Sequence, residues 1–142
     1  MAPSQGWTEE AVTNFTRALR LNPADAAGHY YLGGALDSAG RVAEPQQQFA
    51  EALRLDPEHA GAHLGLGITL REQGREAEAL AQFAEAARLN PKLLEARLYL
   101  GIALLKQQKS SEARRQFEAV LQIDPNNARA SPKCSFLGAA QF

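Results

Sequence analysis

Apolar and small residues in the middle of the chain recur at the spacing of an α-helix. One stretch places them at positions i, i+4 and i+7, as Ala79, Phe83 and Ala86. The stretch before it carries the same pattern with Leu66, Gly67 and Leu70. Gly74 lies between the two stretches, where the end of a helix favours a residue that tolerates positive φ. The pattern therefore predicts two amphipathic helices joined by a glycine turn.

This unit of two helices repeats along the chain with a period of 34 residues. An Asn or Asp followed by proline closes each unit, at Asn22-Pro23, Asp56-Pro57, Asn90-Pro91 and Asp124-Pro125. Equivalent positions of successive units form columns with the same period. The aromatic column consists of Phe15, Phe49, Phe83 and Phe117, and the glycine column consists of Gly33, Gly67 and Gly101. Proline fixes φ for the helix that follows and disfavours helical geometry in the residue before it. Several columns in one register predict an array of helical hairpins.

The columns predict seven helices and no strands. They are expected near residues 8–21, 26–38, 42–55, 60–73, 76–89, 94–107 and 110–123. An acidic column falls in the first turn of the second helix of each pair. A basic column falls in the last turn of these same helices. Their members are Glu10, Glu44, Glu78 and Glu112, and Arg20, Arg54 and Arg88. Both signs suit the helix macrodipole, so we interpret these charges as a solvated outer face.

The pattern resembles the tetratricopeptide repeat family, whose period is also 34. The third unit carries the resemblance most clearly, through Leu66, Gly67, Leu70, Gly74, Ala79, Phe83, Ala86 and Pro91. The resemblance implies an all-α fold, a right-handed α-α superhelix of about three and a half repeats. It places a half repeat at 6–25 and full repeats at 26–59, 60–93 and 94–127. The array then spans residues 1–127, and residues 128–142 form an irregular tail.

Three features depart from the family pattern. Pro45 stands where other units have alanine, in the first turn of its helix, where a missing N–H has little effect. Gln108 replaces the turn glycine and predicts strain or a rearranged turn. The column that holds tryptophan in typical units holds His29, His63 and Arg97, which we interpret as packing between helices.

Charge and composition narrow the classes of function. The 142 residues include 15 Lys or Arg and 16 Asp or Glu, a formal net charge of −1, so no basic surface for nucleic acid is expected. Hydrophobic residues make up 45% of the chain, which is enough for a sizeable core. Neither a signal peptide nor an apolar stretch of the ~20 residues that span a bilayer is visible. We therefore expect a cytoplasmic protein without nucleic acid or membrane partners.

No set of residues predicts catalysis, a metal or a cofactor. His59 and His63 have the i, i+4 spacing of two metal ligands, but no third ligand follows at a matching spacing. Cys134 is the only cysteine, which excludes a disulfide, and no histidine marks it as a nucleophile. The pair Ser110-Ser111 is interpreted as the N-cap of a helix. We expect a protein that is not an enzyme.

The resemblance implies that a peptide or helix of a partner protein docks on the concave face, lined by the first helix of each pair. The residues expected there are Tyr30, Gly34, Asp37, Leu64, Ile68, Arg71, Leu98, Ile102 and Lys106, flanked by Tyr31, Gly65 and Tyr99. For Ile68 and Ile102 the alternative is a place in the core. Some family members clamp a terminal carboxylate, but the matching positions Tyr30, Gly34, Gly65, Glu95 and Tyr99 lack the required chemistry. We therefore expect an apolar ligand segment.

The ends of the array raise a second hypothesis. No capping helix follows the last pair, so Phe117, Val120 and Leu121 are expected to be partly uncovered. The chain could be part of a longer array, the tail could fold back with Phe136 and Leu137, or two chains could stack end to end as a homo-oligomer. The two functional hypotheses are therefore a module that binds a heterologous peptide and a self-assembling structural unit.

Overall fold

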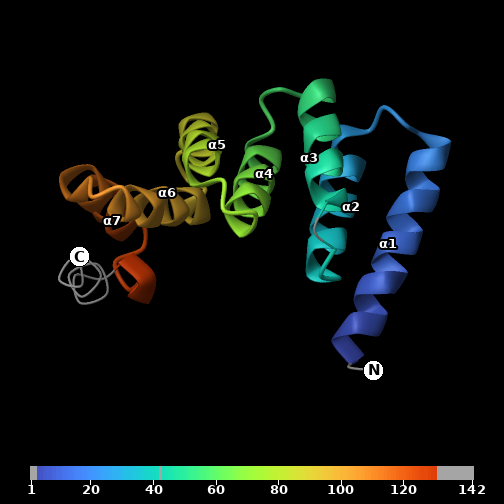
Figure 1. Ribbon diagram of the computed structural model, residues 1–142, viewed down its shortest axis with the longest axis horizontal. Coiled ribbons are helices and arrows are strands. Elements are labelled where there is room, and N and C mark those ends of the chain that lie inside the picture. The colour runs from blue at the N-terminus through green and yellow to red at the C-terminus, as the bar shows by residue number, and fades with distance from the viewer. Residues whose placement is uncertain (1–2, 42, 131–142) are drawn as a thin grey trace.

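The computed structural model describes residues 3–41 and 43–130, which fold into seven α-helices in a row (Figure 1). The helices are α1 (Pro3–Leu21), α2 (Ala26–Ser38), α3 (Glu44–Leu55), α4 (Ala60–Glu72), α5 (Glu76–Leu89), α6 (Leu94–Lys106) and α7 (Ser110–Ile123). A short 3₁₀ turn, η1 (Ala128–Ala130), follows the last helix. No strand occurs within the described residues. The prediction of an all-α array is confirmed.

The boundaries of most helices lie within two residues of the predicted ones. The exception is α1, which begins at Pro3 rather than near residue 8. Proline suits the first position of a helix, because its missing N–H would have no helical partner there. Pro45 lies in the first turn of α3, as expected. The predicted N-cap at Ser110-Ser111 is wrong, because α7 starts at Ser110 and its N-cap is Lys109.

Each helix packs against the next one in the chain, and α2 also contacts α4 in the following pair. Within a pair, the glycine column faces the phenylalanine column. A Cβ atom built on Gly67 would lie 2.6 Å from the Phe83 ring, and one on Gly101 would lie 2.8 Å from the Phe117 ring. Ordinary contacts to a Cβ atom are at least 3.4 Å. The glycines therefore set how closely the two helices of a pair approach.

The turns within the pairs share one geometry, although one of them has no glycine. Gly40 and Gly74 have φ of 77° and 79°, and Gln108 has φ of 63°. In each turn, the next residue donates its backbone N–H to a carbonyl in the preceding helix, as Lys109 does to Leu104 at 2.9 Å. The predicted strain at Gln108 is thus confirmed as left-handed backbone in a residue with a side chain, which costs about 1 kcal/mol.

The histidine column makes the same pair of hydrogen bonds in successive repeats. The ring nitrogens of His63 lie 2.8 Å from the Gln82 side-chain oxygen and 2.9 Å from the Pro57 carbonyl. His29 makes the equivalent contacts to Gln48 and Pro23 at the same distances. In the next repeat, Arg97 donates to the Pro91 carbonyl at 3.0 Å and to Gln116 at 3.3 Å. The column therefore joins the two helices of a pair, as predicted, and it also joins them to the turn before the pair, which was not predicted.

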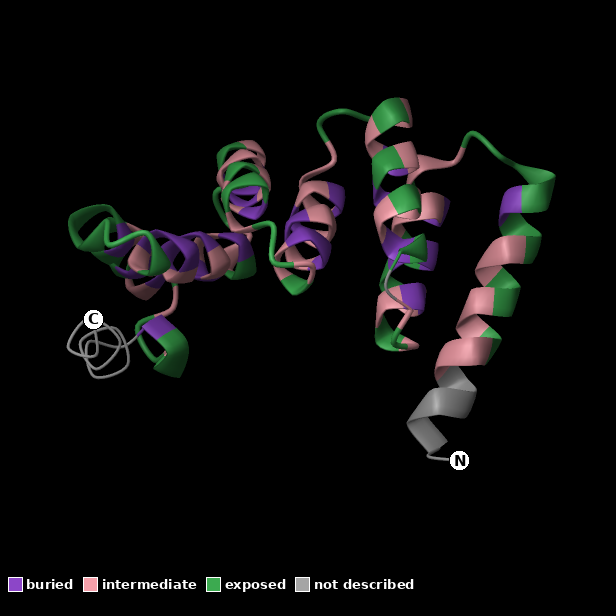
Figure 2. Ribbon diagram, viewed as in Figure 1, coloured by how far each residue is buried: buried purple, intermediate pink, exposed green. Residues whose placement is uncertain are grey.

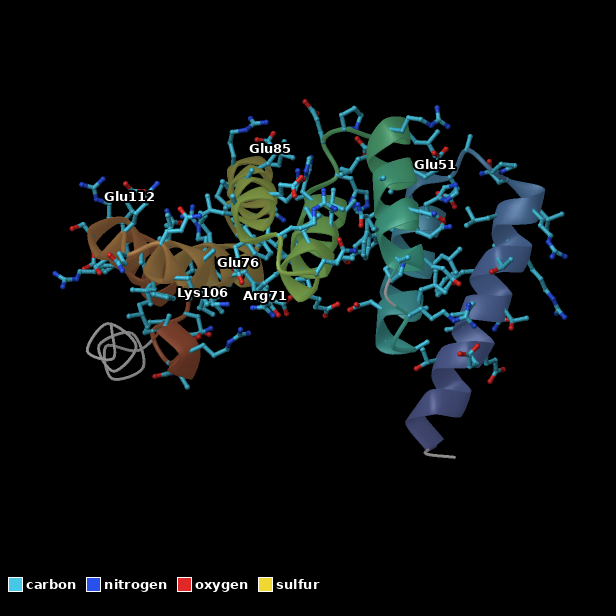
Figure 3. The ribbon with its side chains drawn as sticks, viewed as in Figure 1. Glu51, Arg71, Glu76, Glu85, Lys106 and Glu112 are labelled. Atoms are coloured by element: carbon cyan, nitrogen blue, oxygen red, sulfur yellow. The ribbon has the colours of Figure 1, made fainter. Side chains whose placement is uncertain are left out.

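The predicted outer face carries exposed ion pairs at α3 and α5, the second helices of the first two complete pairs. Arg41 and Arg75 contact Glu44 and Glu78 at 2.9 and 2.5 Å. Glu51, Glu85 and Glu112 lie along one edge of the array, on α3, α5 and α7 (Figure 3). Exposed pairs of this kind contribute at most about 1 kcal/mol each, so the fold depends mainly on its core.

The buried residues lie where neighbouring helices face one another (Figure 2). Phe117 is 4% exposed and Val120 is 0% exposed, so the expectation that they are partly uncovered is wrong. Phe117 packs on the backbone of α6 at Gly101, and η1 contacts α7 at the end of the array. Leu121 is half-buried. The expected cover by Phe136 and Leu137 falls outside the described residues.

Candidate protein-interaction surface

A pocket of about 580 Å³ opens between the first helices of the first two complete pairs. We call it the α2–α4 pocket. Five of the nine residues predicted to contact a partner line it: Tyr30, Gly34, Asp37, Leu64 and Ile68. The flanking residues Tyr31 and Gly65 line it too. Its volume lies within the range of known ligand sites, about 300–1,000 Å³.

Aromatic rings form one wall of the α2–α4 pocket. The Tyr30 ring centroid lies 5.2 Å from that of Tyr31, 4.8 Å from that of His59 and 6.1 Å from that of Phe49. Tyr31 in turn stacks on Phe15 of α1, with centroids 5.7 Å apart. Tyr31 is 53% exposed, which is unusual for a large side chain of the array. These contacts hold the two tyrosines in place while leaving ring surface open.

Burial raises the pKa of the Tyr30 hydroxyl, and the nearby Tyr31 and Glu95 raise it further. Tyr30 is therefore a neutral hydrogen-bonding group at physiological pH. Its ring offers apolar area and its hydroxyl a polar tip, a combination that is common at recognition surfaces.

Glycines create much of the open space. A Cβ atom built on Gly34 would meet nothing within 4 Å, so this position faces the empty part of the pocket. At Gly65 a Cβ atom would lie 2.5 Å from the Phe49 ring, which lines the pocket next to it. Leu64 is 7% exposed and Ile68 is half-buried, so both form the base of the pocket rather than its rim.

The other four predicted residues lie outside the α2–α4 pocket. Leu98 is 3% exposed and belongs to the core, so its predicted place on the partner surface is wrong. Ile102 packs against the same core and is half-buried. The Arg71 guanidinium lies 4.7 Å from the centroid of the Tyr99 ring, and Lys106 forms an ion pair with Glu76 at 3.4 Å. The predicted stripe therefore divides into a pocket and a separate, partly charged region.

Sequence reasoning missed the part of the pocket that α1 contributes. Ala11 and Phe15 line it, although both belong to columns whose other members are buried. The equivalent Phe49, Phe83 and Phe117 are at most 4% exposed. A comparison of each column with its position in the array could have indicated that Phe15 has fewer neighbours.

The carboxylates at the edge of the pocket have no basic counterpart among the lining residues. Asp37 and Glu95 line the pocket, and the lining contains no Lys or Arg. The Glu72 carboxyl of α4 lies close enough to Asp37 of α2 for the two side chains to interact. Partial burial, and then the hydrogen bond and negative charge of Asp37, raise the pKa of Glu72, while Arg71 opposes them.

The two histidines with the spacing of metal ligands make hydrogen bonds within the repeats instead. Within residues 3–41 and 43–130, no group of three or more His, Cys, Asp or Glu side chains could hold a metal ion. His59 instead caps α4, because its Nδ1 accepts a hydrogen bond of 3.0 Å from the Ala62 N–H. Cys134 lies outside the described residues. No helix in the described ranges is long and apolar enough to cross a membrane.

A row of helical hairpins with a pocket on its first helices defines a helical-repeat protein of the interaction-scaffold class. Two models of the tetratricopeptide repeat match the chain, one over residues 70–132 and the other over residues 4–44 and 46–93. The chain belongs to the tetratricopeptide repeat family. Proteins of this family typically act as scaffolds without catalysing a reaction. The comparison with curated proteins gives no match.

Solved structures of other repeat proteins share the fold. YrrB, described as a TPR protein with an unusual peptide-binding site, is 29% identical over 96% of this chain and 68% of its own, with a TM-score of 0.76. PilF of Pseudomonas aeruginosa is 25% identical over 96% of this chain and 66% of its own, with a TM-score of 0.81. The first TPR of Spaghetti (RPAP3), bound to the HSP90 peptide SRMEEVD, is 22% identical over 82% of this chain and 92% of its own, with a TM-score of 0.74. Some proteins with this fold therefore bind peptides of partner proteins.

Proposed function

We propose that the chain binds a segment of a partner protein in the α2–α4 pocket and thereby acts as a protein-interaction scaffold. The observation that carries the proposal is a pocket of about 580 Å³ with open ring surface on Tyr30 and Tyr31 and open space above Gly34. Aromatic area in a concave, largely apolar site is the usual source of binding free energy at protein interfaces. The peptide-binding site described for YrrB supports the same class of function.

The ligand differs from a peptide held by its terminal carboxylate. A carboxylate clamp needs several Lys, Arg or Asn side chains that converge on one point. The lining of the α2–α4 pocket contains none of these residue types. An internal segment with apolar side chains, extended or helical, suits this surface better.

The test fills the pocket without unfolding the array. Peptides that bind the whole chain are first selected from a random display library, and their affinities are then measured by isothermal titration calorimetry. Gly34→Leu places a side chain in open space and exchanges glycine for a better helix former, so it should keep or raise stability. We expect it to weaken peptide binding at least about tenfold, because the new side chain occupies the space that the ligand needs.

The matched control is Ala50→Leu, which adds similar apolar bulk at an exposed position of α3 outside the pocket. It should leave the affinity unchanged. Equal affinity of the Gly34→Leu variant and the wild type would refute the proposed site, and equal loss in both variants would attribute the effect to nonspecific surface changes.

A second candidate function is self-association through the end of the array. The burial of Phe117 and Val120 removes two of the three residues expected to drive it, and Leu121 is half-buried. Among the described residues, Ile123 is a large apolar side chain that is exposed near this end, with an exposed fraction of 52%. A molar mass from light scattering that rises with concentration, and does not rise in an Ile123→Lys variant, would favour this function.

A further inference from the structure

Three carboxylates lie in the lining of the α2–α4 pocket or directly beside it. Asp37 and Glu95 line it, and Glu72 lies beside Asp37. The ion pairs found in the described part of the chain all join other residues. A largely apolar pocket with an uncompensated negative edge is complementary to a ligand that combines apolar and basic side chains.

The position of the Asp37–Glu72 pair makes its negative charge unfavourable in the free protein. Asp37 lies in the last turn of α2, which contains no basic residue, and Glu72 is the last residue of α4. The C-terminus of a helix carries a partial negative charge, so it favours basic rather than acidic side chains. Local rules of helix design are often broken where a site is kept ready for a ligand.

The nearest basic side chains are engaged elsewhere. Arg71 lies on the same face of α4 as Leu64 and Ile68, but its guanidinium lies over the Tyr99 ring of α6, and Lys106 pairs with Glu76. Figure 3 shows these three charged residues, Arg71, Glu76 and Lys106, close together between α4 and α6. Of these, only Arg71 has a favourable interaction with Glu72, and it is weaker than the opposing effects of burial and Asp37.

We propose that the partner segment carries a Lys or Arg side chain that reaches the Asp37–Glu72 pair while its apolar side chains contact Tyr30, Tyr31 and Leu64. This inference rests on the proposed function and specifies the chemistry of its ligand. Tyr30 and Asp37 lie seven residues apart on α2, or about 10 Å at 1.5 Å per residue. An extended peptide covers that distance in about three residues. The basic residue is therefore expected about three positions from an aromatic or aliphatic anchor.

The experiment uses the same random peptide library on the whole chain. We expect selected peptides to be enriched in Lys or Arg about three positions from a Phe, Tyr, Trp or Leu. The double variant Asp37→Asn/Glu72→Gln should weaken the selected peptides about fivefold, in line with a partly exposed charge pair, and should reduce the salt dependence of binding. The control Glu51→Gln/Glu85→Gln removes the same charge from the outer edge seen in Figure 3 and should leave both quantities unchanged.

The outcomes separate this inference from the proposed function. Selected peptides that are neutral or acidic, or that bind the Asp37→Asn/Glu72→Gln variant as tightly as the wild type, would overturn the basic ligand. If those peptides still lose affinity with Gly34→Leu, the pocket keeps its proposed role. A library that yields no peptide sensitive to Gly34→Leu would overturn both.

Discussion

Gly33 and Gly34 are neighbours in α2, and replacing each with alanine separates the packing role of a glycine from its helix propensity. Both positions lie inside the helix, so alanine should stabilise either one by about 0.5–1 kcal/mol when nothing else changes. A Cβ atom on Gly34 meets nothing within 4 Å. A Cβ atom on Gly33 would lie 2.8 Å from Phe49 Cε1 and 3.0 Å from Phe49 Cδ1 and Cζ.

The Phe49 ring has little room to move, because it is 3% exposed. Overpacking of a core costs about 1–3 kcal/mol. Gly34→Ala should therefore raise the free energy of unfolding by about 0.5–1 kcal/mol, while Gly33→Ala should change it by about 0 to −2.5 kcal/mol. The two variants should therefore differ in stability by about 1–3 kcal/mol. For a chain of this size, each kcal/mol corresponds to roughly 3 °C in Tm.

Urea unfolding followed by circular dichroism measures both variants against the wild type. Gly67→Ala serves as a second test of the same contact, because its Cβ would lie 2.6 Å from the Phe83 ring. Equal stability of Gly33→Ala and Gly34→Ala would refute the claim that the glycine column sets the approach of paired helices.

Three further predictions concern the turns, the carboxyl pair and the histidine column. Gln108→Gly should raise the free energy of unfolding by about 1 kcal/mol, because it removes left-handed strain; an unchanged urea midpoint would contradict this. Glu72→Gln should stabilise the protein by about 0.5 kcal/mol at pH 7, since the raised pKa of Glu72 means that its ionisation opposes folding. The contribution of protonated Glu72 to stability is complete below the ordinary carboxyl pKa and is lost as the pH rises through the raised pKa of Glu72. The advantage of the Glu72→Gln variant should therefore vanish in acid. Thermal melts of both proteins across this pH range test the sign. His63→Ala should cost about 1–2 kcal/mol through two lost hydrogen bonds, whereas His63→Arg should lose less, because Arg97 makes the same two contacts one repeat later; equal loss in both would argue against a shared role.

The repeated pattern of residues along the chain was enough to predict the helices and their pairing. A period of 34 residues put phenylalanine opposite glycine in every complete unit, and this match leaves little choice of partner for each helix. The turn geometry also followed, since Gly40 and Gly74 predicted left-handed backbone that Gln108 then had to adopt. These are local features or short-range contacts, which depend on residue types at fixed spacings.

Which of the equivalent residues are exposed, in contrast, depends on how the helices pack in space. Tyr30, Leu64 and Leu98 occupy one column, yet Tyr30 is half-buried in the wall of the pocket, while Leu64 and Leu98 are both buried in the core and only Leu64 also lines the pocket. The pairing of Asp37 with Glu72 likewise depends on the contact between α2 and α4, which no single repeat contains. Exposure and charge environment are set by every neighbour in space, and those neighbours change along the array while the repeated pattern stays the same.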